Sequence, residues 1–114
     1  MITLESLKEL GCDVETGLKR CVNNEKLYLR LVGTIPGNDN FVKLYEAIEI
    51  KDYENAFQAA HGLKGILANL SLTPIYDPVA EITEYLRAKE ERDYKEVIKR
   101  IEENRLNLAK LAEE

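Results

Sequence analysis

The residues of this sequence best suited to chemistry lie in the stretch Ala60-His61-Gly62-Leu63-Lys64-Gly65. His61 is the only histidine in the chain. Near neutral pH an uncharged imidazole keeps a lone pair on one ring nitrogen, and that lone pair can attack phosphorus. On a helix, Lys64 at i+3 lies on the same face and can stabilise the oxygens of a phosphoryl group on that nitrogen. The pair therefore predicts a histidine that accepts a phosphoryl group with electrostatic help.

The helix that must position this pair is predicted to run from about Tyr53 to Leu70, with Asp52 as its N-cap. At about 100° per residue, one broad side of it is apolar and must be buried against other helices. That side holds Ala56, Ala59, Ala60, Leu63, Ile66, Leu67 and Leu70. His61 falls on the opposite side and is predicted to face outward. The residues expected around it are Lys64, Gly65, Ala68, Glu54, Phe57 and Gln58.

Gly65 is unexpected inside a helix, because glycine there costs about 1 kcal/mol relative to alanine. Bare backbone beside His61 would let another protein approach closely. Alternatively, it would let a neighbouring helix of the same protein pack closely. The angular position of Gly65, near His61 and away from the apolar face, favours access for a partner.

Phe57 and Gln58 each have two interpretations. The Phe57 ring either lies along the edge of a neighbouring helix or helps to dock a partner. The Gln58 amide either hydrogen-bonds the imidazole from i−3 or is simply solvated. Both alternatives stay open at this point.

The run His61-x-x-Lys64-Gly65, preceded by Ala59-Ala60 and followed by Ala68-Asn69-Leu70, resembles the signature of histidine-containing phosphotransfer domains, the HPt family. The spacing of further segments is similar to that of bacterial phosphorelay members, and the resemblance covers roughly residues 3 to 108. These segments are Asp13-Val14-Glu15-x-Gly17-Leu18-Lys19-Arg20, Leu27-Tyr28-Leu29 and Asp52-Tyr53-Glu54-x-Ala56. The chain has Ile66 and Ser71 where members commonly have a small residue and a glycine.

The resemblance implies a role for each residue of this site. His61 would accept and donate a phosphoryl group, Lys64 would assist electrostatically, and Gly65 would leave room for a receiver domain. The rest of the docking surface would come from Ala68, Phe57 and Gln58. The implied partners are response-regulator receiver domains and, as a further candidate, a sensor histidine kinase. No cofactor is expected in the chain itself, because the receiver would supply Mg²⁺.

The apolar spacing predicts an all-α fold, an antiparallel up-down four-helix bundle with additional short N-terminal helices. The four main helices are expected to begin near Asn40, Asp52, Thr73 and Asp93. The short N-terminal helices, capped by Thr3 and Asp13, would cover one end or side of the bundle. HPt domains are bundles of this kind, so the resemblance agrees with the periodicity. Residues 1–114 are expected to form one HPt-like domain.

Several details concern where helices begin and which side chains they bury. Thr73-Pro74 is predicted to be an N-cap followed by the first helical residue. Pro78 leaves two alternatives, a kinked first turn or a regular helix that begins at Asp77-Pro78. The N-terminal helices are predicted to bury Val22 and Leu31.

Composition restricts the class of protein. A net charge of −5, with basic and acidic residues mixed along the chain, argues against nucleic acid as the main partner. Cys12 and Cys21, with one histidine, cannot complete a zinc site and are expected to be reduced thiols. The sequence has no phosphate-binding glycine loop, signal peptide or membrane-length apolar run. We therefore expect a cytoplasmic protein that has no nucleotide site of its own and makes no membrane contact. Together with the resemblance to HPt domains, this implies a phosphocarrier that is not an enzyme.

Three hypotheses for function follow. The first is a carrier that moves a phosphoryl group between the aspartates of receiver domains in a multistep two-component phosphorelay. The second is the phosphoacceptor domain of a larger histidine kinase, which would need an ATP-binding domain outside this sequence. The third is a helical interaction module whose histidine is incidental.

Overall fold

The computed structural model describes residues 1–113, and every regular element in that part of the chain is helical. The shorter helices come first: α1 Leu4–Leu10, α2 Val14–Arg20 and α3 Glu25–Thr34. The 3-10 turn η1 (Ile35–Gly37) leads into the longer helices α4 Asp39–Glu49, α5 Tyr53–Asn69, α6 Thr73–Arg87 and α7 Lys95–Glu113. The described residues contain no strand, which confirms the predicted all-α class.

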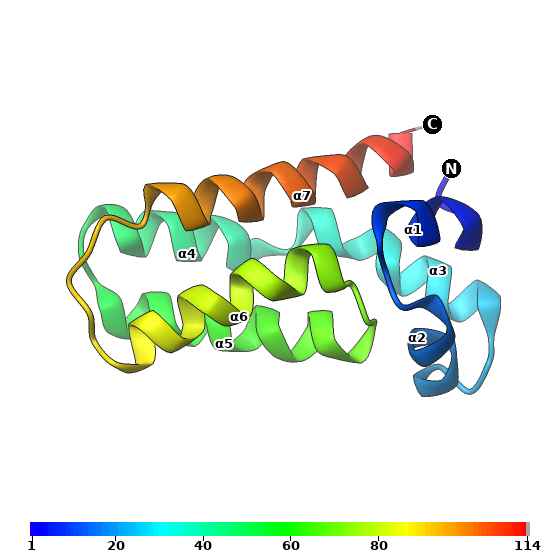
Figure 1. Ribbon diagram of the computed structural model, residues 1–114, viewed down its shortest axis with the longest axis horizontal. Helices are drawn as coiled ribbons and strands as arrows, with labels where there is room; N and C mark the ends of the chain where they lie inside the picture. The colour runs from blue at the N-terminus through cyan, green and yellow to red at the C-terminus, as the bar shows by residue number, and fades with distance from the viewer. Residues whose placement is uncertain (114) are drawn as a thin grey trace.

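Helices α4 to α7 form an antiparallel up-down bundle (Figure 1). Helix α5 packs against both α4 and α6, and α6 packs against α7. The N-terminal helices α1 to α3 lie together at one end of this bundle (Figure 1). Each bundle helix begins within two residues of its predicted start. Among the described residues, no helix combines the length and the apolar character that a membrane span requires.

Side chains that accept backbone N–H groups fix where several helices begin. Asp52 accepts from the backbone N–H of Asn55 at 3.2 Å at the start of α5. Asp13 accepts in the same way from Thr16 at 3.3 Å at the start of α2. Thr3 begins α1 in a capping box. The predicted N-caps Thr3, Asp13 and Asp52 are therefore confirmed.

Helix α6 begins one residue earlier than predicted. Its N-cap is Leu72 instead of Thr73, and Thr73 is already helical. The Leu72 carbonyl accepts the backbone N–H groups of Ile75 and Tyr76 at 3.0 and 2.8 Å. Pro74 is tolerated one position further in, because the N–H groups of the first turn have no partner within the helix.

Helix α6 also continues through Pro78, so the alternative start at Asp77-Pro78 is wrong. Proline has no N–H to donate to the carbonyl four residues earlier, which here belongs to Pro74. The Pro78 ring is buried in the bundle, and this burial offsets part of the missing hydrogen bond.

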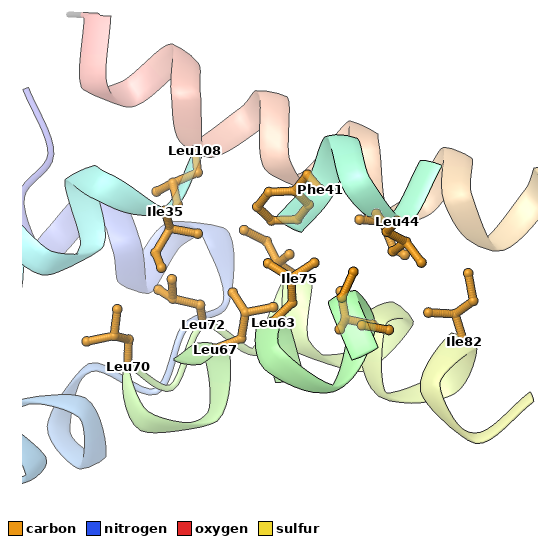
Figure 2. Close-up of a cluster of buried hydrophobic side chains, with 14 of the residues drawn as sticks. Ile35, Phe41, Leu44, Leu63, Leu67, Leu70, Leu72, Ile75, Ile82 and Leu108 are labelled. Carbon is orange, nitrogen blue, oxygen red and sulfur yellow. The ribbon is translucent and has the colours of Figure 1, made fainter. Parts of the chain in front are cut away.

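The core is formed by apolar side chains from every helix of the bundle and from the segment that precedes it (Figure 2). Ile35 of η1 and Leu108 of α7 lie at the end of the bundle near Leu70 and Leu72 (Figure 2). Further along, Phe41 and Leu44 of α4 pack over α5 and α6 (Figure 2). The largest fully buried side chains are Tyr28, Phe41, Leu7, Ile35, Leu44, Leu63, Leu67, Leu72, Ile82, Ile101, Leu108 and Val32.

Three apolar side chains that were predicted to be buried are exposed: Val22, Leu31 and Ile66. Helix α2 ends at Arg20, and the backbone at Val22 has a φ of 49°, so helical spacing no longer places its side chain, which is 81% exposed. Leu31 and Ile66 lie at the edges of the apolar faces of α3 and α5. The face that each helix buries is therefore narrower than its apolar pattern.

The N-terminal helices are held on the end of the bundle through the α5–α6 connection. The Tyr28 hydroxyl donates to the Leu70 carbonyl at 2.8 Å, and the Asp13 N–H donates to the Ser71 carbonyl at 3.1 Å. Gly17 makes this approach possible. A Cβ at Gly17 would lie 2.6 Å from the Tyr28 ring and 2.8 Å from the Leu70 carbonyl oxygen, so a larger residue requires a shift.

We predict that Gly17→Ala lowers the free energy of unfolding by about 1 to 3 kcal/mol, as overpacking typically does. Gly33→Ala in α3 is the matched control, because a Cβ at Gly33 meets no atom within 4 Å. The control should gain up to about 1 kcal/mol from helix propensity. Urea unfolding of both variants measures the difference, and equal stabilities would contradict the close contact at Gly17.

Candidate functional site

His61 lies in the second half of α5, and its side chain is exposed. The opposite side of α5 is buried against the neighbouring helices through Ala56, Ala59, Ala60, Leu63 and Leu67. Small alanines on this face let α4 and α6 approach α5 closely, while the leucines fill the core between them. Because α5 is packed on two sides, the direction in which His61 points is fixed by burial of the rest of the helix. The structure therefore places the imidazole outward, as the periodicity predicts.

The imidazole of His61 lies against the ring of Phe57, one turn earlier on α5. The two ring centroids are 5.6 Å apart and the ring planes are inclined by 20°, which is a stacked arrangement. The Arg87 guanidinium of α6 lies 5.1 Å from the centroid of the Phe57 ring. Phe57 is itself half-buried and packs against the core. Phe57 thus has both a packing role and a direct contact with the imidazole.

Lys64 lies one turn after His61 and is half-buried at the α5–α6 boundary. Its ammonium is 3.8 Å from a carboxylate oxygen of Glu84 on α6. The same oxygen of Glu84 lies 3.4 Å from Nε of Arg87. Ion pairs with this exposure contribute about 0 to 1 kcal/mol to stability, so they hold side chains loosely. Lys64 can therefore turn toward another anionic group at little energetic cost.

Gly65 faces open space. A Cβ at this position would meet no atom within 4 Å, apart from the backbone of its own helix. This observation argues against close helix packing, which was the alternative interpretation of the glycine. By contrast, a Cβ at Gly62 would lie 3.1 Å from the side-chain nitrogen of Asn40 on α4. The two glycines of the motif thus differ: Gly62 faces a neighbouring helix and Gly65 faces outward beside the imidazole.

The other expected site residues lie at the border of this exposed surface. Gln58 is exposed, and the structure gives it no hydrogen bond to His61 within residues 1–113, which favours the solvated alternative. Ala68 is half-buried, and its carbonyl accepts a hydrogen bond from Arg20 of α2. The exposed surface of α5 therefore ends where α2 touches it.

Sequence reasoning missed Glu84 and Arg87. They are three residues apart on α6, and their pairing with each other is visible from that spacing. Their contacts to Lys64 and Phe57 depend on the register of α6 against α5, for which the sequence gives no local signal. Both residues belong to the site because they contact the neighbours of His61.

Two carboxyl groups of the bundle have lowered pKa values, and neither belongs to the contacts around His61. A hydrogen bond from Arg100 of α7 lowers the pKa of Glu81 on α6. A hydrogen bond from Arg105 lowers the pKa of Glu102, which also accepts from the Tyr45 hydroxyl of α4 at 2.6 Å. The Arg100–Glu81 ion pair joins α7 to α6. Arg105 and Glu102 both lie on α7, and the hydrogen bond from Tyr45 joins this pair to α4. The lowered pKa values of Glu81 and Glu102 thus reflect interactions that stabilise the bundle, and they do not identify a functional site.

Comparison with known proteins identifies the family. The sequence model of the Hpt domain matches residues 37–113, which include all of α4 to α7 and therefore His61, Lys64 and Gly65. The match leaves out α1 to α3, although the resemblance in the sequence extends into them. Neither the search of curated proteins nor the search of solved structures returned a match. Hpt domains are phosphocarriers that act in histidine phosphotransfer and interact with receiver domains in phosphorelays. This chain belongs to the Hpt domain family.

Proposed function

We propose that the chain carries a phosphoryl group on His61 between the aspartates of receiver domains in a multistep two-component phosphorelay. The observation that carries this proposal is the open approach to the imidazole. His61 is exposed, and the Cβ position of Gly65 beside it faces empty space. An incidental surface histidine gives no reason for a glycine in the middle of a 17-residue helix.

The transfer exchanges one bond to phosphorus for another. The lone pair of the unprotonated ring nitrogen of His61 attacks the phosphorus of a receiver's aspartyl phosphate. The bond from phosphorus to the carboxylate oxygen breaks, and its electron pair stays on that oxygen. The receiver regains its aspartate, and the phosphorylated imidazole keeps the proton on its other nitrogen. Attack by the aspartate of a second receiver reverses these steps, so the chain needs no nucleotide of its own.

The residues around His61 have separate tasks in this scheme. Lys64 stabilises the phosphoryl oxygens as their charge changes during transfer. The ring of Phe57 holds the imidazole in a stacked position before a partner arrives. Gly65, Ala68 and Gln58 form the surface on which the receiver sits. The receiver brings Mg²⁺ and its own catalytic groups, so we assign no metal or cofactor to this chain.

Two further assignments belong to this proposal. The contacts of Tyr28 with Leu70 and of Asp13 with Ser71 support one domain that includes α1 to α3 together with the bundle. We place the domain in the cytoplasm, because the proposed receiver partners work there. Phosphorylation by a receiver, instead of by an ATP-dependent kinase domain, would separate this function from the phosphoacceptor of a larger kinase.

We predict that His61→Gln abolishes acid-labile phosphorylation by a phosphorylated receiver domain. Glutamine keeps a similar size and polarity at an exposed position, so the melting temperature should stay within a few degrees of the parent value. Autoradiography of the transfer reaction after acid and base treatment measures the outcome. Acid-labile phosphate on the His61→Gln variant would show that the acceptor is a different residue.

Gly65→Gln is predicted to remain folded and to lose transfer. The added side chain enters open space, so replacing glycine should stabilise the domain by up to about 1 kcal/mol. The same side chain fills the approach beside the imidazole, so the transfer rate should fall, and it should fall less for Gly65→Ala.

Gly33→Gln is the matched control for this experiment, because Gly33 is also an unobstructed helical glycine and lies in α3, away from His61. It should gain similar stability and keep the parent transfer rate. A Gly65→Gln variant that unfolds at a lower temperature, or that transfers at the parent rate, would rule out the docking role of Gly65.

A further inference from the structure

Glu84 of α6 is an acidic group placed where it competes with a phosphoryl group for Lys64. One of its carboxylate oxygens lies 3.8 Å from the Lys64 ammonium and 3.4 Å from Nε of Arg87. Within residues 1–113, Glu84 is the one acidic partner of Lys64 inside 4.0 Å. The ammonium on which the transfer depends is therefore already paired before any phosphoryl group arrives.

The contacts that begin at His61 connect α5 and α6 in a continuous series that ends at Lys64. His61 stacks on Phe57, the Arg87 guanidinium lies against the Phe57 ring, Glu84 pairs with Arg87, and Glu84 also pairs with Lys64. Lys64 is the least exposed ion-pair partner of this series, with 29% of its side chain accessible, against 57% for Glu84. Glu84 thus pairs with Lys64 on the side of α6, while His61 lies one turn earlier on α5.

A phosphoryl group on His61 changes the energy of this arrangement. Its negative oxygens attract Lys64, so the ammonium must leave Glu84 or be shared with it. The carboxylate of Glu84 stays close to Lys64 and opposes the new negative charge. Both effects favour the unphosphorylated state of His61 over the phosphorylated one.

We propose that Glu84 is a positioning residue that acts through Lys64 and lowers the phosphoryl affinity of His61. This inference rests on the proposed function of His61 as the phosphoryl acceptor. On this proposal, Glu84 increases the tendency of the domain to pass its phosphoryl group to a receiver. Without Glu84, Lys64 would bind the phosphorylated imidazole more strongly and the domain would retain the group.

The equilibrium constant of transfer tests this role directly. The reactants of this equilibrium are the phosphorylated receiver and the unphosphorylated domain. The products are the unphosphorylated receiver and the phosphorylated domain. The constant depends only on these four unbound species, so a variant that merely weakens docking leaves it unchanged. It is measured from the distribution of phosphoryl groups after a radiolabelled receiver and the domain have equilibrated.

Glu84→Gln should shift this equilibrium roughly two- to fivefold toward the phosphorylated domain, the range that corresponds to an exposed ion pair. The shift should shrink at high salt, because exposed charges are screened. Glu84→Asp, which keeps the charge, should stay closer to the parent value. Glu103→Gln on α7 is the matched control, because its side chain has a similar exposure of 60% and pairs with Lys99. It should leave the equilibrium unchanged.

Glu84→Gln in a Lys64→Ala background tests whether Glu84 changes the transfer equilibrium through Lys64. If Glu84 acts through Lys64, Glu84→Gln should have little further effect there, as a double-mutant cycle of coupled residues requires. An equal shift in both backgrounds, or no shift in the parent background, would overturn the proposal. Melting temperatures of all variants confirm that they are folded.

Transfer by the parent chain, measured beside the variants, shows whether a negative result concerns the role of Glu84 or the proposed function of His61. If the parent chain takes no phosphoryl group at His61, the proposed function fails and the role of Glu84 fails with it. If the parent chain transfers through His61 while Glu84→Gln keeps the parent equilibrium, only the role of Glu84 is wrong.

Discussion

Burial of one face of α5 is the constraint on which the rest of this structure depends. The helix lies between α4 and α6, and its alanines allow both neighbours to come close. Rotation of α5 about its axis would expose the leucines of the core, at about 25 cal/mol for each Å² of apolar surface returned to water. The direction of every outward side chain on α5 follows from that cost. The outward direction of the His61 side chain is thus set by residues on the opposite, buried face of the same helix.

Much of the fold was predictable because its signals are local. Helix spacing in the apolar residues and the acidic N-caps at Asp13 and Asp52 located the helices to within two residues. The errors occurred where local signals were ambiguous. Thr73 has the chemistry of an N-cap, but the backbone begins α6 at the carbonyl of Leu72. Val22 fits the apolar spacing of α2, but the helix has already ended there.

In the candidate site, too, the local relations could be predicted from the sequence and the contacts between helices could not. His61, Lys64 and Gly65 lie on one helix, so their relation could be predicted from spacing alone. The residues that contact them from α6, Glu84 and Arg87, depend on how two helices are set against each other. That setting arises from the shapes of buried side chains such as Leu63, Val79 and Ile82, which a single sequence does not encode as a pattern. Which functional side chains share a face of one helix could be predicted, whereas the side chains that a neighbouring helix brings to them became visible only in the structure.

The stacking of His61 on Phe57 has a consequence for entropy. An exposed imidazole on a helix samples several rotamers. In the transfer that we propose, a partner must restrict them before the ring nitrogen lines up with phosphorus. Here the ring lies against a half-buried phenyl group that is itself packed on the core. Folding of the domain therefore already restricts the rotamers of the imidazole. A binding partner then has fewer rotamers left to restrict. In the transfer that we propose, such a carrier can work through brief, weak complexes, which suits a protein that releases one partner before it meets the next.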